Sequence, residues 1–337
     1  MRRSISLFRM GLLLAVGLTL VGCGGSGGKG NTNSSGVYVA GCFQDGNRYL
    51  ACYWRNNNRV TLPGTDGDAY AITVSAGTVY AAGSYTSGNQ DIPCYWVGTT
   101  KHDLPIPSGD GNAHAIAVSD GTIYVAGYYE SNGITIPCYW VNGVRKDLGS
   151  GGEARAIAVF NGTIYIAGNL SAPCYWKGTD NMVRTDLLGP SGQSQGDAYG
   201  ITVYNGIAYT AGNYNGGSYY RPCYWSDNAC ISLNGGNSNT EAVAIAVGSD
   251  GTVYTAGYYW NNGRTVPCYW AGTTRIPLTS DEEGEVAAIA VANGLVYTAG
   301  NLDTTIQQSC YWQGTVRTDL TRVGNGLTKA RSIYVVP

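Results

Sequence analysis

Charged residues are scarce in this chain of 337 residues, at 12% of the sequence against about 25% in an average soluble protein. The 20 Lys and Arg residues are balanced by 22 Asp and Glu residues, so there is no basic field to hold a phosphate backbone. Histidine is rarer still, with two residues. These shortages argue against nucleic acid as a partner and against hydrolytic metal sites.

Familiar catalytic motifs are also missing. The sequence contains no Ser-x-x-Lys, no His-Glu-x-x-His and no phosphate-binding loop. We therefore predict a protein that is not an enzyme and needs no cofactor. Calcium bound by Asp66 and Asp68, or by acids between Asp281 and Glu285, is a weak alternative, because carboxylates are ligands that calcium prefers but neither run has EF-hand spacing.

The longest apolar run, Met10 to Val21, is too short to span a bilayer comfortably and follows three arginines, which is typical of a signal peptide. It ends in Leu-Val-Gly-Cys, which resembles the lipobox of bacterial lipoproteins. That resemblance implies cleavage before Cys23 and lipidation of its thiol. We expect residues 1–22 to be a lipoprotein signal peptide and residues 23–35 to be the lipidated Cys and a flexible Gly/Ser tether. The protein would be exported and anchored to a bacterial membrane, facing the periplasm or the cell surface.

Three short motifs recur along the rest of the chain. Cys-Tyr-Trp and Tyr-x-Ala-Gly each occur seven times, and six segments close to Ala-Ile-Ala-Val are completed by a seventh, Ser332-Ile333-Tyr334-Val335. A leucine ends each unit, and dipeptides such as Asn161-Gly162 supply the tight turn between the first two motifs. Each unit is thus predicted to be four short antiparallel strands, A to D, which is the period of a propeller blade.

We predict an all-β fold over residues 36–337, a seven-bladed β-propeller of four-stranded antiparallel blades. The chain enters this domain at a strand B and ends with a strand A, so the C-terminal strand A is expected to join the N-terminal strands B, C and D and close the ring. The segment Trp140 to Leu148 also resembles bacterial extracellular repeats of the HAF type. These resemblances imply architecture and no function, and we expect a monomer.

The motif cysteines are predicted to be buried free thiols, because packed sheets lie about 10 Å apart and a disulfide needs Cα atoms within about 7 Å. Cys42 falls outside the motif and lies on strand B roughly opposite Cys52 on strand C. The two could form a disulfide in an exported protein. Cys230 has no obvious partner.

The D–A and B–C loops should emerge on one face of the ring, where the repeats differ most. Five of the seven copies carry an acid just before strand A, and the residue two positions later varies in size and charge. The acids are Asp68, Glu153, Asp197, Glu241 and Glu285. The most prominent of the variable residues are Tyr70, His114, Arg155, Tyr199 and Arg331. We predict that they form a ligand-binding ring at the channel mouth, although acids that cap loop backbone and solvated lining side chains would fit the same pattern.

The B–C loops place tyrosines among Asn, Ser and Gly, a mixture typical of antibody paratopes and of surfaces on which sugars stack. Trp260, Tyr219 and Tyr220 are the candidate contacts there. We predict an envelope-anchored recognition or scaffold module that binds a glycan or a protein through this face. The alternative is a glycan-active hydrolase or lyase that uses a pair of the mouth acids, since glycoside cleavage needs two carboxyl groups roughly 5–10 Å apart.

Overall fold

The computed structural model describes residues 35–236, 239–322 and 324–337. The predicted signal peptide, Cys23 and all but the last residue of the tether lie outside this part of the chain. The described residues form 28 β-strands, and among them there is no helix long and apolar enough to cross a membrane.

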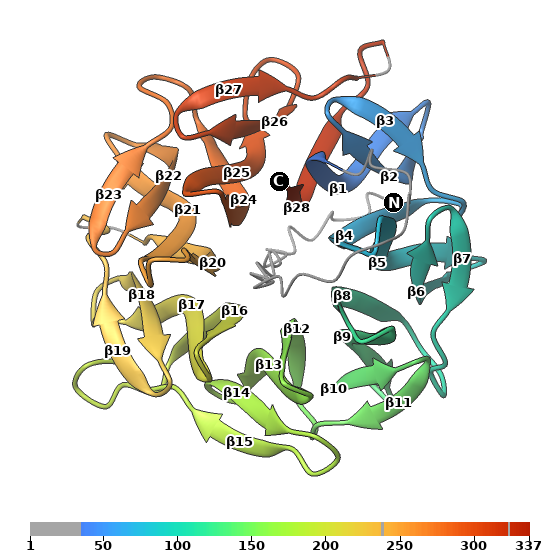
Figure 1. Cartoon of the computed structure of the whole chain (residues 1–337), viewed down its shortest axis with the longest axis horizontal. Coiled ribbons are helices and arrows are strands. Elements are labelled where there is room, and N and C mark those ends of the chain that lie inside the picture. Colours follow the sequence, from blue (N-terminus) through green and yellow to red (C-terminus); the bar gives the residue numbers. More distant parts are fainter. Residues whose placement is uncertain (1–34, 237–238, 323) are drawn as a thin grey trace, which may run out of the picture.

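The strands form seven four-stranded antiparallel sheets arranged as blades around a central axis (Figure 1). We number the blades from 1, which combines β28 with β1–β3, to 7, which consists of β24–β27. The innermost strands A are β28 (Thr328–Val336), β4 (Gly67–Ser75), β8 (Gly111–Ser119), β12 (Gly152–Phe160), β16 (Gly196–Tyr204), β20 (Glu241–Val247) and β24 (Gly284–Ala292). The strands B are β1 (Gly36–Asp45), β5 (Thr78–Ser87), β9 (Thr122–Ser131), β13 (Thr163–Leu170), β17 (Ile207–Asn215), β21 (Val253–Asn261) and β25 (Leu295–Leu302).

The outer half of each blade is shorter. The strands C are β2 (Arg48–Arg55), β6 (Gln90–Val97), β10 (Ile134–Val141), β14 (Pro173–Gly178), β18 (Tyr220–Ser226), β22 (Arg264–Ala271) and β26 (Gln308–Gln313). The strands D are β3 (Asn58–Thr61), β7 (Thr100–Asp103), β11 (Val144–Asp147), β15 (Val183–Asp186), β19 (Ala229–Ser232), β23 (Thr274–Pro277) and β27 (Val316–Asp319). The predicted seven-bladed propeller is therefore confirmed.

The ring closes within blade 1, as predicted. That sheet has the order β28-β1-β2-β3, with Gly36 opposite Val336 and Tyr38 opposite Tyr334. The last strand of the chain thus pairs with its first described strand.

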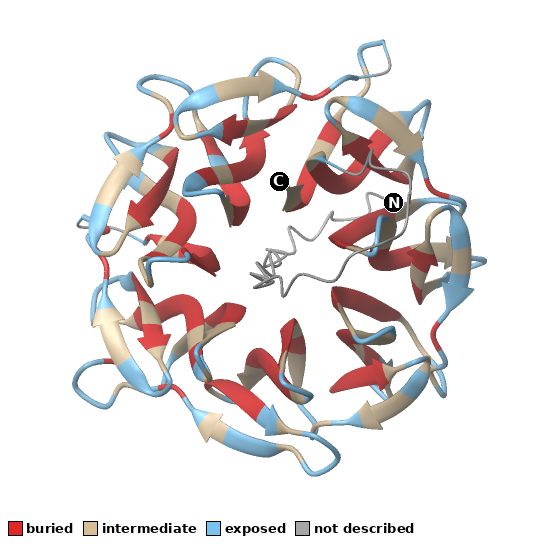
Figure 2. Cartoon of the chain, viewed as in Figure 1, coloured by how far each residue is buried: buried red, intermediate tan, exposed pale blue. Residues whose placement is uncertain are grey.

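The motif tryptophans form the core between blades. All seven are buried, and Figure 2 shows that burial is concentrated in the inner strands of each blade while the outer strands are more exposed. Five of their indole N–H groups donate to the backbone carbonyl that follows the closing leucine of the preceding blade. These bonds join Trp54 to Thr321, Trp96 to Pro63, Trp140 to Pro105, Trp225 to Leu188 and Trp270 to Asn234, at 2.8–3.1 Å. The repeated Trp and Leu therefore fasten each of these blades to its neighbour.

The seven motif cysteines are buried free thiols, as predicted. The pairing suggested for Cys42 and Cys52 is wrong in the structure, where both thiols are free. The reason is the register, because Cys42 lies opposite Ala51 and Cys52 lies opposite Gly41. Since successive side chains point to opposite faces of a sheet, the one-residue offset puts the two thiols on different faces.

A β-bulge interrupts every strand A at the same place. In β4, for example, the register shifts between Ala69 and Ala71, so Tyr70 is the extra residue. The glycine of Tyr-x-Ala-Gly makes this possible. A Cβ atom on Gly83 would lie 1.9 Å from the carbonyl oxygen of Asp68, and the glycines of the other blades have the same contact. A bulge re-aims the side chain of its extra residue, and here the seven bulges lie at the start of the strands that line the channel.

Candidate functional site

The extra residues of the seven bulges are the variable positions identified from the sequence. They are Tyr70, His114, Arg155, Tyr199, Val243, Ala287 and Arg331. The sequence placed the acids just before strand A, but they belong to that strand, two residues before each bulge residue. The bulges therefore place both sets of side chains, the bulge residues and the residues two positions before them, at one mouth of the channel.

On one side of the mouth these side chains pack tightly together. Arg331 of blade 1 donates to the Oδ2 atom of Asp68 in blade 2 at 2.9 Å, and both side chains are about nine-tenths buried. The rings of Tyr70 and His114 meet edge to face at 5.6 Å between centroids, and His114 meets Tyr128 at 5.2 Å. Blades 1 to 3 thus fill their part of the mouth, which we call the filled half.

The filled half also holds buried polar atoms without a hydrogen-bond partner among the described residues. They are Oδ1 of Asp68, Oδ1 of Asn112 and Nδ1 of His114. Burial lowers the pKa of His114 to about 4; Glu153 opposes that change, and Arg155 and Arg331 add to it. His114 is therefore neutral at pH 7. Burial likewise raises the pKa of Tyr128 to about 12.

Arg155 joins blades 4 and 5 at the edge of this half. Its guanidinium lies 3.2 Å from Glu153 and 2.8 Å from Asp197, and it stacks over Tyr199 at 5.0 Å from the ring centroid. Asn169 also donates to Asp197. Burial alone would lower the pKa of Arg155, but Glu153 and Asp197 raise it overall, so the charge is fixed.

The other side of the mouth is hollow. A cavity of about 680 Å³, which we call the mouth pocket, extends from Arg155 in blade 4 across blades 5, 6 and 7 to Arg331 in blade 1. The bulge residues of blades 6 and 7 are Val243 and Ala287, which are too short to fill the space that Tyr70 and His114 fill opposite. The lining includes Asp197, Tyr199, Asn213, Tyr220, Glu241, Tyr258, Thr265, Glu285, Asn301, Asp303, Gln307 and Lys329.

Carboxyl groups of the mouth pocket differ in their surroundings. The Glu285 side chain is exposed to the pocket, yet the surrounding walls displace bulk water and raise its pKa, while Arg331 partly offsets that rise. Desolvation and then Glu283 raise the pKa of Asp303. Asp197, by contrast, is paired with Arg155. The pocket therefore presents carboxylate acceptors in different surroundings, one paired with an arginine and two shielded from bulk water.

Aromatic side chains stand at the rim of this pocket. Tyr220 lines it directly and is 39% exposed. Trp260 is 43% exposed and, like Tyr219, is not among the lining residues. It lies opposite Thr265, so it shares a face of its hairpin with Thr265 and Tyr258, which both line the pocket. Tyr219 is exposed but is not among the lining residues.

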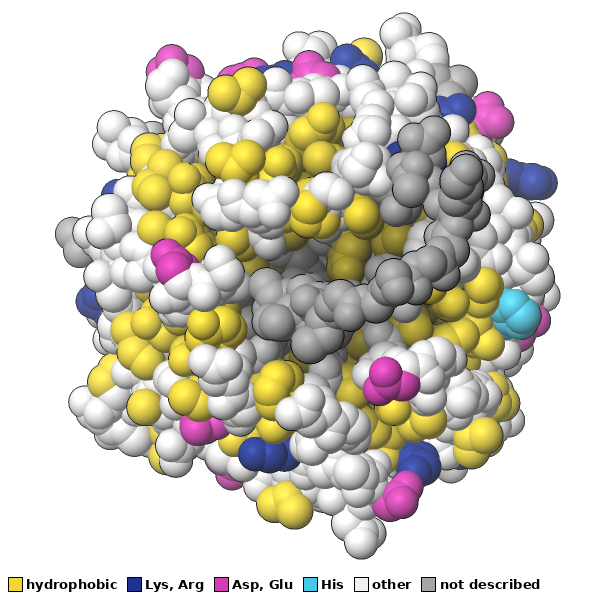
Figure 3. All heavy atoms as spheres, viewed as in Figure 1, with side chains coloured by type: hydrophobic (Ala, Val, Ile, Leu, Met, Phe, Trp, Pro, Cys, Tyr) yellow, Lys and Arg dark blue, Asp and Glu magenta, His cyan; other side chains and the backbone are white. Residues whose placement is uncertain are grey.

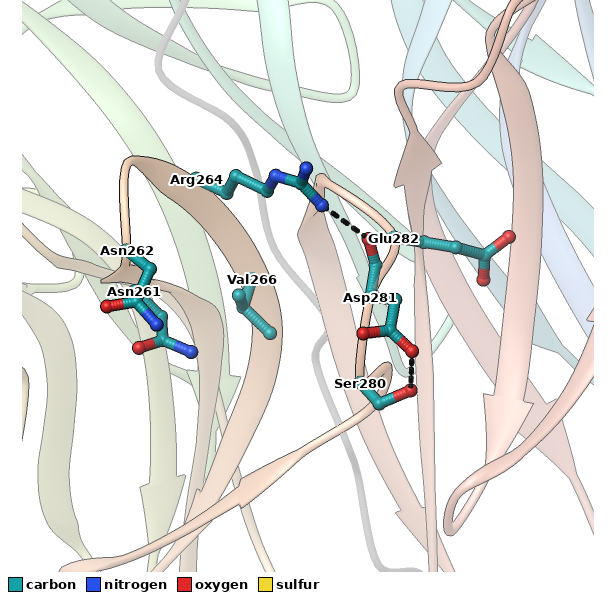
Figure 4. Close-up of a pocket in the computed structure, with 7 residues that line it drawn as sticks. All are labelled: Asn261, Asn262, Arg264, Val266, Ser280, Asp281 and Glu282. Carbon is teal, nitrogen blue, oxygen red and sulfur yellow. Dashed lines mark hydrogen bonds between the residues drawn. The ribbon is translucent and has the colours of Figure 1, made fainter.

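A smaller cavity of about 240 Å³ lies beside this rim, between the tip of the β21–β22 hairpin and the segment before β24 (Figure 4). In it the Asp281 side chain accepts from Ser280, and the Glu282 side chain points away from Asn261 and Asn262. Glu282 instead pairs with Arg317 at 2.6 Å. In the described part of the chain no three His, Cys, Asp or Glu residues form a group that could hold a metal ion, and calcium binding stays a prediction.

Charge is also sparse on the face of the ring drawn in Figure 3. Hydrophobic side chains surround the centre of that face, and the acidic and basic ones are scattered, mostly toward the rim. Among the described residues visible on this face there is no continuous basic surface.

The structure thus brings seven of the predicted residues into one pocket. They are Arg155, Asp197, Tyr199, Tyr220, Glu241, Glu285 and Arg331. Asp68, Tyr70 and His114 lie in the filled half instead, and Glu153 supports Arg155. Sequence reasoning missed Asn213 and Asn301, which also line the pocket. Asn213 and Asn301 follow the motif glycine directly, so their position in the repeat could have indicated them.

Comparison with known proteins gives the fold alone. No family model matches the chain, and no curated protein matches its sequence. The fold is similar to that of a puromycin-hydrolysing peptidase of Mycobacterium tuberculosis, with a TM-score of 0.53 and 10% identity over 84% of this chain and 53% of that chain. A mutant puromycin hydrolase in complex with PGG is similar as well, with a TM-score of 0.55 and 10% identity over 82% of this chain and 51% of that chain.

The apo form of AztD from Citrobacter koseri gives a TM-score of 0.47 and 11% identity over 90% of this chain and 98% of that one. This chain spans about half the length of the two hydrolases. At such identities the likeness concerns the propeller and not its chemistry.

Proposed function

We propose that this protein is a recognition module that binds a hydroxyl-rich ligand, a glycan segment, in the mouth pocket. The observation that carries the proposal is the hollow side of the mouth, where Glu241 and Glu285 lie among tyrosines in a cavity of about 680 Å³. Ligand pockets commonly measure about 300–1,000 Å³. The pocket therefore has the size for one small ligand or for a short stretch of a longer one.

The chemistry of the lining favours a sugar. Carboxylates accept hydrogen bonds from hydroxyl groups, and the amide groups of Asn213 and Asn301 can both donate and accept. Tyr220 and Trp260 offer flat faces and polar edges at the rim, where a sugar ring can stack. The fixed charges nearly cancel, because Arg155, Lys329 and Arg331 lie among four acids. A neutral polar ligand fits this balance better than a highly charged one.

The test is a glycan array probed with the full chain and with its Trp260→Ala and Glu241→Gln variants. We expect the wild type to bind a defined set of glycans and both variants to lose at least about tenfold in affinity, which corresponds to about 1.4 kcal/mol. Leu295→Ala is the matched control, since Leu295 is 46% exposed and Trp260 is 43% exposed, but Leu295 lies at the opposite end of its blade.

The thermal midpoint of each variant separates a contact from a core residue. An unchanged midpoint with lost binding identifies a ligand contact. A blank array with the wild type would overturn the glycan proposal and direct the search to polypeptide ligands of the same face.

A glycan-active hydrolase or lyase is the second candidate, and one observation favours it. Glu241 and Glu285 share the pocket, and the raised pKa of Glu285 is what a general acid requires. If the protein cleaves its ligand, Glu285→Gln should abolish product formation while binding remains. Intact oligosaccharide after prolonged incubation with the wild type would exclude this candidate.

We also propose that the module is attached to a bacterial membrane through a lipid on Cys23. The support is the lipobox-like Leu-Val-Gly-Cys after an apolar run. Cys23→Ala should move the protein from the membrane fraction to the soluble fraction of cells that express it. Retention of this variant in the membrane fraction would refute the lipid anchor.

A further inference from the structure

Blade 5 departs from the other blades at one position of its outer strand. In six blades a Lys or Arg lies opposite the motif tryptophan. These residues are Arg59, Lys101, Arg145, Arg184, Arg275 and Arg317. In blade 5 the residue opposite Trp225 is Cys230.

The position faces the motif thiol in the blades that keep the cation. Lys101 acts on the ionisation of Cys94, Arg184 on that of Cys174, and Arg317 on that of Cys310. The cation also pairs with an acid at the end of strand D in four blades, as Lys101 does with Asp103 at 3.3 Å. In blade 5 that acid is replaced too, by Ser232. Blade 5 is therefore the blade that lacks both charges, and it is also the one that carries a second cysteine at this position.

The two thiols of blade 5 are on the same face of the sheet. Cys223 pairs with Ser232 and Trp225 pairs with Cys230, so Cys223 and Cys230 are diagonal neighbours on adjacent strands. Diagonal Cα atoms lie about 7–8 Å apart, and a disulfide needs about 7 Å or less, so a small tightening of the hairpin suffices. The two thiols are close enough for each to affect the ionisation of the other. We infer that Cys223 and Cys230 are a reactive dithiol that closes to a disulfide within blade 5.

The local environment assigns the order of the steps. Cys223 is buried, whereas Cys230 is half-buried on β19, the outer edge of the sheet, where a reagent can reach it. The hydrogen bond from Cys223 lowers the pKa of Cys230, while burial raises that of Cys223. Cys230 is thus the thiol that ionises and attacks first.

The oxidant is a small or protein disulfide. The Cys230 thiolate attacks one of its sulfur atoms, the oxidant's S–S bond breaks, and one oxidant thiol leaves. Cys223 then loses its proton to solvent and attacks the Cys230 sulfur, expelling the second oxidant thiol. Two protein S–H bonds are lost, one S–S bond forms, and the oxidant's disulfide is reduced to two thiols. An exported protein, as this one is predicted to be, would meet such oxidants.

The experiment incubates the folded full chain with oxidised glutathione, then denatures and alkylates it without reduction. We expect the peptide that contains Cys223 and Cys230 to lack two hydrogen atoms and to carry no alkyl group. The buried cysteines of the other blades, such as Cys94, should be alkylated completely. Reduction of the oxidised protein should lower its thermal midpoint by a few degrees.

Two variants keep the test specific. Cys230→Ser should leave Cys223 alkylated and make the thermal midpoint insensitive to reductant. Lys101→Cys combined with Asp103→Ser copies the arrangement into blade 2 and should link residue 101 to Cys94. Alkylation of both Cys223 and Cys230 in the oxidised wild type, or a stable adduct with glutathione on Cys230, would overturn the inference.

Discussion

The two sides of the channel mouth are built from the same repeat and differ through a few side chains. In blades 2 and 3 the bulge residues Tyr70 and His114 occupy the mouth, whereas Val243 and Ala287 in blades 6 and 7 leave it open. The backbone is the same in both, because every strand A has its bulge and every strand B its glycine. The fold therefore provides seven equivalent bulge positions around the mouth. The size of the side chain at each of them determines where a ligand can enter.

Breaking the filled half should cost the most stability. Arg331→Met leaves Asp68 buried without its ion pair, and we expect a loss of about 3–5 kcal/mol in the free energy of unfolding. Chemical denaturation measures the change. Arg317→Met is the control, since its pairs with Glu282 and Asp319 are more exposed, and such pairs contribute about 0–1 kcal/mol. Equal losses in both variants would show that the filled half is not held by this ion pair.

Low pH should destabilise the folded protein in the filled half, because His114 must then be protonated. Its pKa of about 4 in the folded protein lies below the ordinary value of 6.5, so the unfolded chain binds the proton more tightly. The stabilisation is complete above pH 6.5 and is lost as the pH falls toward 4, by about 3 kcal/mol in total. Unfolding of the wild type and of His114→Phe across this range should give curves that differ by this amount. Parallel curves would refute a neutral buried His114.

The bulge glycines should contribute equally to the free energy of unfolding in both halves. A Cβ atom on Gly127 would lie 1.9 Å from the carbonyl oxygen of Asn112, and one on Gly257 would lie 2.0 Å from that of Glu241. We expect Gly127→Ala and Gly257→Ala each to cost about 1–3 kcal/mol in the free energy of unfolding, because the strands must move apart. A loss in only one half would mean that the two halves do not share the constraint.

Converting the open half into a filled one should weaken ligand binding. Val243→Tyr copies the residue of blades 2 and 5 into blade 6 and should occupy the mouth pocket. We expect ligand affinity to fall at least about tenfold. Because Val243 is buried, the larger ring must also displace its neighbours, which should lower the free energy of unfolding by about 1–3 kcal/mol. Val243→Thr, which keeps the size, should retain binding. Undiminished binding by Val243→Tyr would place the ligand elsewhere on the protein.

The fold could be predicted almost completely because the repeat that encodes one blade occurs seven times in the sequence. A single Ala-Ile-Ala-Val is ambiguous between a strand and a buried helix, but seven copies at regular spacing, each followed by a turn dipeptide, remove that ambiguity. The closure of blade 1 followed from which strands come first and last.

The sequence predicted which positions line the channel mouth, but it did not predict the shape of the pocket. The variable residues were found, but their bulge was not, although a glycine inside a strand is a signal for one. Which half stays open depends on side-chain size at the bulge positions together with contacts between neighbouring blades, such as that of Arg155 with Asp197. No pattern within one repeat encodes those contacts. The error over Cys42 and Cys52 was one of register, since a turn at Gly46 and Asn47 pairs Cys42 with Ala51.

The closing blade allows the number of repeats to change during evolution. Because β28 and β1–β3 share one sheet, the pairing of the last strand with the first described strand lies inside a blade, and the chain crosses every border between blades from a strand D to the next strand A. Recombination that adds or deletes one whole repeat elsewhere in the gene leaves that pairing untouched. The number of blades can then vary while the closing sheet is inherited unchanged, and each new copy brings one more mouth position on which selection can act.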